Sequence, residues 1–172
     1  MTKNGTTEEE RRLTEIFRAM GAKDPEGCAS SHVNEGFAQL ARFCFLKQAW
    51  THVRDDADTD WAHRVAGTAA DPDGPLGGLA PALKRILDKG ADPADVLEVV
   101  RVMQYELLFG LLYQLGCPEL DFLPEGAGHI DWALFQTNEQ GEPIAPLHGL
   151  HESVLSMDPT GREMRPKARN QP

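Results

Sequence analysis

The residues best suited to chemistry lie near the C-terminal end of the chain, in the run His148-Gly149-Leu150-His151-Glu152. Residues three and four positions apart share one face of a helix, so His148, His151 and Glu152 would point the same way. Two imidazoles and a carboxylate can bind zinc, iron or manganese and leave positions open for water. His129 and Asp131 could complete or support this site, with Asp131 as a catalytic acid or base. The pattern predicts a divalent metal site; the alternative is a loop–helix junction whose histidines bond to backbone or water.

Glu106 is the second candidate, because its neighbours at helical spacing are all apolar. They are Val102, Met103, Phe109 and Gly110. A carboxylate in such surroundings is expected to be buried with a partner or to lie at the rim of a pocket, where it would act as a catalytic acid or base. The alternative is a structural contact with a neighbouring helix, for which the sequence offers three donors: His32, Arg42 and His52.

The common catalytic motifs are absent from the sequence. It has no glycine-rich phosphate loop, GxSxG elbow, HExxH, paired CxxC or EF-hand, which excludes the usual nucleotide-binding, serine-hydrolase and structural-zinc classes. Three cysteines without a CxxC pair make a poor disulfide framework and indicate a reducing compartment. The first dozen residues lack the apolar core of a secretory signal, and the longest apolar run, 107–113, is too short for a membrane span. We therefore expect a cytoplasmic protein.

Charge is distributed unevenly along the chain, whose net charge is −10. Residues 117–161 contain no Lys or Arg, and residues 162–172 are basic. An acidic surface repels phosphate backbones and anionic lipid, which excludes nucleic acid and membranes as partners, and it attracts metal ions or a basic protein. The 117–161 segment carries eight acids: Glu119, Asp121, Glu125, Asp131, Glu139, Glu142, Glu152 and Asp158.

Periodicity and capping signals predict helices over most of the first two thirds of the chain. Thr7 and Glu10 form a capping box at the start of a helix that Gly21 ends. Two apolar helices, over 31–54 and 92–115, are expected at the centre. Shorter helices are expected after Asp58, over 79–90 and over 150–155, and the glycine- and proline-rich stretch 67–78 is a loop.

The C-terminal third has a different composition. Residues 130–136 are typical of a strand, and they return through 143–145 after a turn at 138–141, which predicts a hairpin. The sequence thus predicts a mainly α fold, a helical bundle of five or six helices with a small irregular β-hairpin in the C-terminal third. Residues 1–161 are expected to form a single domain, followed by a disordered basic tail over 162–172.

Two functions of different classes follow from these features. The first is a protein-binding module, such as an inhibitor, an immunity-type protein or an adaptor, which presents its acidic C-terminal third to a basic partner. The second is a metal-dependent enzyme that uses His148, His151 and Glu152, with Glu106 or Asp131 as acid or base.

Overall fold

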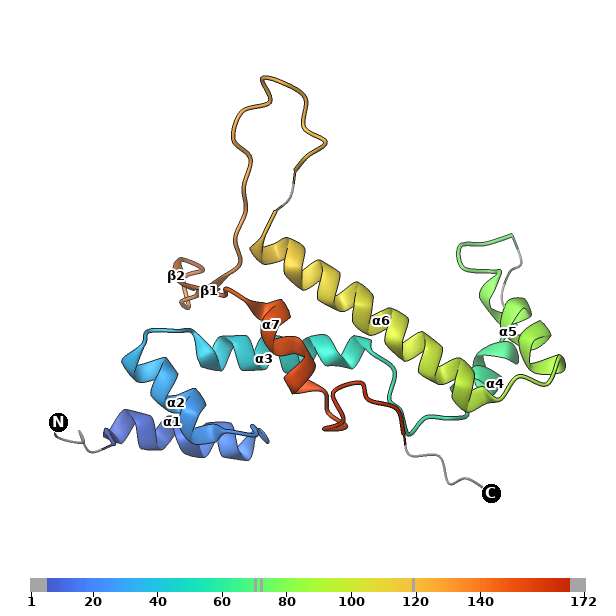
Figure 1. The fold of residues 1–172 in the computed structure, drawn as a ribbon, viewed down its shortest axis with the longest axis horizontal. Coiled ribbons are helices and arrows are strands. Elements are labelled where there is room, and N and C mark those ends of the chain that lie inside the picture. The colour runs from blue at the N-terminus through green and yellow to red at the C-terminus, as the bar shows by residue number, and fades with distance from the viewer. Residues whose placement is uncertain (1–5, 70, 72, 119, 168–172) are drawn as a thin grey trace.

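The computed structural model describes all residues except 1–5, 70, 72, 119 and 168–172 (Figure 1). Within this described part it is mainly helical and has one antiparallel hairpin in the C-terminal third, as the sequence predicted. No helix among the described residues is both long enough and apolar enough to cross a lipid bilayer. The elements are α1 (Glu8–Ala19), α2 (Pro25–Asn34), α3 (Gln39–Ala49), α4 (Trp61–Ala66), α5 (Leu79–Asp88), α6 (Pro93–Gly116), β1 (Phe135–Thr137), β2 (Pro143–Pro146) and α7 (Leu150–Val154).

The start of α1 follows the sequence signal. The Thr7 hydroxyl accepts from the Glu10 amide at 3.1 Å, and the Glu10 carboxylate accepts from the Thr7 amide. Two of the orphan amides at the helix start are thereby satisfied. The inner face of α1 buries Phe17, whose ring meets that of Phe43 edge-on at 5.7 Å. This contact joins α1 to α3, and Ala29 of α2 is buried in the same cluster.

The prediction of a single central helix over 31–54 is wrong. The structure has two helices in this region: α2 ends at Asn34, and α3 starts at Gln39 and continues into a 3-10 turn over Trp50–His52. Gly36 has a φ of +73°, which glycine adopts readily and other residues only with strain. Helix α2 packs on α1 after the turn at Gly21, and the turn at Gly36 lets α3 leave α2 and run towards α6 and α7 (Figure 1). Because the expected helix is split, the described residues form seven α-helices, where five or six were expected.

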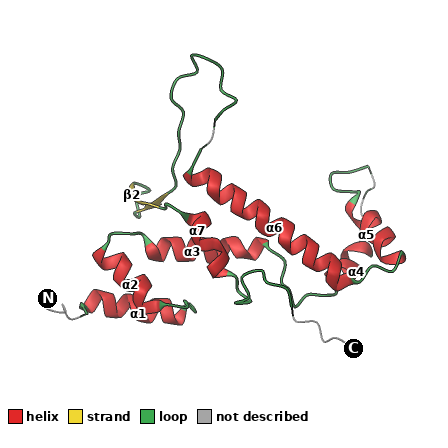
Figure 2. Ribbon diagram, in the orientation of Figure 1, coloured by secondary structure: helices red, strands yellow, loops and turns green. Residues whose placement is uncertain are grey.

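The long helix α6 confirms the prediction for 92–115, including its start at Asp92, whose carboxylate accepts from the Ala94 amide at 2.9 Å. Its N-terminal part packs with α4 and α5 around Trp61 and Leu97. Its C-terminal part packs with α3 and α7 around Leu112. The helix therefore connects two of the apolar clusters of the fold (Figure 2).

The hairpin pairs Gln136 with Ala145, and its turn is held by Asn138, whose side-chain oxygen accepts from the amides of Gln140 and Glu142. The first strand is shorter than the expected 130–136. Of the tail expected to be disordered, residues 168–172 lie outside the described residues. Residues 162–167 lie against the body, where Arg162 pairs with Asp56 at 2.8 Å.

Candidate functional site

The predicted metal ligands do not share a helix face. Helix α7 begins at Leu150, directly after Gly149, whose φ is +58°. His148 therefore lies in the loop before the helix. The prediction that it shares a helix face with His151 and Glu152 is wrong. His148 instead lines a hollow together with His129 and Asp131, in which the His129 Nε2 and Asp131 Oδ2 atoms lie 4.0 Å apart.

His151 lies elsewhere, between α7 and α6. Its ring meets the ring of Tyr113 edge-on at 5.0 Å and that of Phe109 at 5.8 Å. Its Nδ1 atom is buried without a hydrogen-bond partner among the described residues. This environment is that of an aromatic packing residue, and it separates His151 from the hollow that contains His148.

Glu152 is exposed and lies close to Gly149 and to the guanidinium of Arg42. Arg42 donates to the Gly149 carbonyl oxygen at 3.2 Å and to the Ser153 hydroxyl at 3.0 Å, which fastens the start of α7 to α3. Burial lowers the pKa of Arg42, and the negative charge of Glu152 partly opposes this. Among the described residues, no three His, Cys, Asp or Glu side chains come together in a way that could hold a metal ion. The metal site stays a prediction from the sequence alone.

Glu106 is exposed on the outer face of α6 and not buried with a partner. None of the three expected donors reaches it: Arg42 is engaged at α7, and Glu106 makes no hydrogen bond or ion pair within the described part of the chain. Its neighbours Met103 and Leu107 are also exposed. The carboxylate therefore sits in an apolar surface that is open to solvent.

A buried ion pair that the sequence did not reveal lies on the opposite face of α6. Arg101 is only 2% exposed, and its guanidinium lies 4.0 Å from the carboxylate of Asp158, which is equally buried. The same guanidinium donates to the carbonyl oxygen of Arg54. Asp158 also accepts from the amides of Thr160 and Met164, both at 2.9 Å. These bonds hold the C-terminal segment against α6.

The pKa of Asp158 reflects this setting. Burial by itself would raise it, but hydrogen bonds from Met164 and Thr160 and the charge of Arg101 outweigh burial and lower it below the usual value. One signal for the pair was present in the sequence: Arg101 is four residues from both Leu97 and Tyr105, in the stripe that faces the core. Its partner Asp158 had no such signal.

The acidic segment is largely open to solvent. Six of its eight acids are exposed, Asp158 is buried, and Glu119 lies outside the described residues. Residues 120–134 form a long loop that projects from the body beyond the end of α6 (Figure 1). Asp121, Glu125 and Glu139 make no hydrogen bond or ion pair within the described residues, so their charges face solvent.

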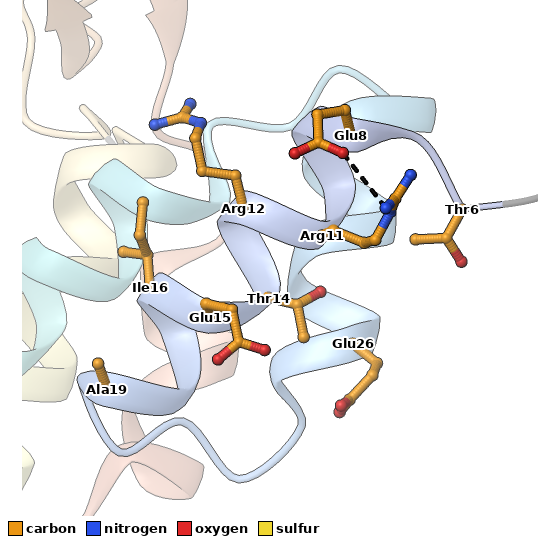
Figure 3. Close-up of a pocket in the computed structure, with 9 residues that line it drawn as sticks. All are labelled: Thr6, Glu8, Arg11, Arg12, Thr14, Glu15, Ile16, Ala19 and Glu26. Carbon is orange, nitrogen blue, oxygen red and sulfur yellow. Dashed lines mark ion pairs between the residues drawn. The ribbon is translucent and has the colours of Figure 1, made fainter.

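A hollow beside α1 and α2 differs from the acidic segment in its charges (Figure 3). It is lined by both signs of charge, and Arg11 pairs there with Glu8 at 3.3 Å. Exposed pairs of this kind contribute about 0–1 kcal/mol each. The acids and arginines of this hollow offset one another, unlike those of the acidic segment. This surface serves as a control region for the acidic segment.

No known family, no curated protein and no solved structure matches this chain.

Proposed function

We propose that this protein is an acidic protein-binding module that presents its C-terminal third to a basic partner. The observation that carries the proposal is the set of exposed acids over 121–152, in a segment that contains no Lys or Arg to neutralise them. Three of these acids, Asp121, Glu125 and Glu139, have no intramolecular partner among the described residues.

The physical basis is electrostatic steering. Uncompensated charges of one sign raise the rate at which an oppositely charged partner arrives, and they do so less as salt increases. At physiological ionic strength the reach of such charges is about 8 Å, so the projecting loop brings its acids to a partner before the body does. An inhibitor, an immunity-type protein or an adaptor would use such a surface.

A pull-down from lysate tests the proposal with two variants of equal charge. The first neutralises Asp121, Glu125 and Glu139 to the matching amides. The control neutralises Glu8, Glu9 and Glu15, which lie on α1 and leave the capping residue Glu10 intact. We expect the wild type and the control to capture the same basic proteins, in amounts that fall as salt rises, and the first variant to capture much less.

Glu142 and Glu152 are left unchanged in this test. Glu142 accepts from the Asn138 side chain at 2.8 Å, and Glu152 lies against Gly149, so their replacement would alter the hairpin turn or the start of α7. Equal capture by the wild type and by both variants would show that the acidic segment is only a solvated surface.

A further inference from the structure

The outer face of α6 is apolar although it lies in solvent. Val99, Met103, Leu107 and Leu111 follow one another at intervals of four residues, and each is 51–65% exposed. Side chains at this spacing form a ridge of the kind that packs into the groove of another helix. A helix face turned to water normally carries charged and polar residues, and a continuous apolar patch marks an interaction site.

Beside this ridge on the helix surface lie Gly110, which has no side chain, and Glu106, which is negatively charged. Gly110 has open space where a Cβ would stand, so no described residue fills the position that a side chain would take. Such a gap lets another helix approach closely. Glu106, one turn before Gly110, places a carboxylate among the apolar side chains of the face. A docked partner would desolvate this carboxylate, which is costly unless the partner supplies a cation.

The acidic loop adjoins the end of the same face. Trp132 donates from its indole nitrogen to the carbonyl oxygen of Gln114 at 2.8 Å, which brings the loop back to the last turn of α6. Asp131 precedes this contact and is exposed. No Lys or Arg occurs between Arg101 and Arg162. The acidic loop thus returns to the C-terminal end of α6, and neither the ridge nor the loop contains a Lys or Arg.

We infer that the outer face of α6 docks an amphipathic helix of a basic protein, with the apolar side of that helix on the Val99–Leu111 ridge and a Lys or Arg on Glu106. The inference rests on the proposed function and names the form of its partner. A second copy of this chain fits poorly, because two bodies of net charge −10 repel and an antiparallel pairing of α6 would bring two Glu106 carboxylates together at its centre.

Binding of a designed helical peptide tests this. The probe is an 18-residue peptide of leucine and lysine at helical spacing, labelled for fluorescence anisotropy, and its leucine–glutamate counterpart is the reference. We expect the wild type to bind the lysine peptide and not the glutamate peptide. Glu106→Lys and Gly110→Leu should each weaken binding by about tenfold or more, the first by reversing the charge and the second by filling the gap.

Two controls keep the test decisive. Glu9→Lys makes the same charge change on α1, at an exposed residue outside α6, and should alter binding much less. Gly110→Leu places a side chain in open space within a helix and should leave the thermal midpoint unchanged or higher, so its loss of binding would not reflect unfolding. Sedimentation of the wild type tests whether a second copy of the chain occupies the face, and co-sedimentation with phosphatidylcholine vesicles tests whether a lipid surface does.

The inference is overturned by several outcomes: no preference for the lysine peptide, equal binding by both α6 variants and the wild type, or a dimer or vesicle complex that Gly110→Leu abolishes. These outcomes are separable from failure of the proposed function. If neutralising Asp121, Glu125 and Glu139 reduces capture of basic proteins but the α6 variants do not, the acidic segment binds the partner and the α6 face does not.

Discussion

Replacement of Asp158 by alanine should be among the most destabilising single changes in this chain. The substitution removes the carboxylate that lies 4.0 Å from the guanidinium of Arg101, which stays buried at 2% exposure and donates to the carbonyl oxygen of Arg54. It also removes the acceptor for the amides of Thr160 and Met164. Breaking a buried ion pair by removing one partner costs about 3–5 kcal/mol. The charge of Asp56 also acts on Arg101, but Asp56 already pairs with Arg162 and Lys167.

This cost can be converted to a thermal shift. For a chain of 172 residues, a loss of 1 kcal/mol lowers the melting temperature by about 2–4 °C, so Asp158→Ala should lower it by about 6–20 °C. Arg101→Met should cost less, because Asp158 keeps its hydrogen bonds from Thr160 and Met164. The double variant should be more stable than the sum of the two losses predicts, with a coupling of about 1–3 kcal/mol.

Urea denaturation followed by far-ultraviolet circular dichroism measures all four proteins of this cycle. The control is Asp88→Ala, which removes an exposed carboxylate paired with Lys84 at 3.3 Å and should cost less than about 1 kcal/mol. If Asp158→Ala costs no more than this control, or if the two single losses simply add, the buried pair does not hold the C-terminal segment and the reasoning is refuted.

Three further predictions concern acid stability, the turn at Gly36 and metal. Because the folded pKa of Asp158 is lowered, its contribution is complete above the unfolded value of about 3.9 and is lost as pH falls through the folded value, so Asp158→Asn should flatten the loss of stability measured below about pH 4. Gly36→Ala should cost about 1–2 kcal/mol in urea denaturation because φ is +73° there, whereas Gly110→Ala, within a helix, should be neutral or stabilising. Elemental analysis of untagged protein decides the metal hypothesis: near-stoichiometric zinc, iron or manganese that a His148→Ala/His151→Ala variant lacks would support it, and metal-free protein would exclude it.

Local signals in the sequence predicted the elements that are set locally. The capping box at Thr7 and the start of α6 at Asp92 are formed by residues within one helical turn, so short patterns were sufficient. The break at Gly36 was missed because the apolar pattern continues on both sides of it. A glycine alone does not reveal whether the backbone takes a positive φ, since that depends on the packing of α2 against α1.

The candidate site was harder to predict because it depends on contacts between distant segments. The shared face of His148, His151 and Glu152 required a helix that began before residue 148, and the positive φ of Gly149 delays it to Leu150. The burial of Arg101 depends on Asp158, which lies more than fifty residues later in the chain. The exposure of Glu106 depends on which side of α6 meets α3 and α7, and apolar residues on both sides of the helix concealed this.

The distance in sequence between Arg101 and Asp158 has a consequence for synthesis. A ribosome adds about 5–20 residues per second, so Asp158 is synthesised about 3–11 seconds after Arg101. The contact of α1 with α2 joins residues near in sequence and can form during this interval. Until Asp158 emerges, Arg101 has only carboxylates earlier in the chain, such as Asp56, to offset its charge, so this part of α6 cannot take its final buried packing.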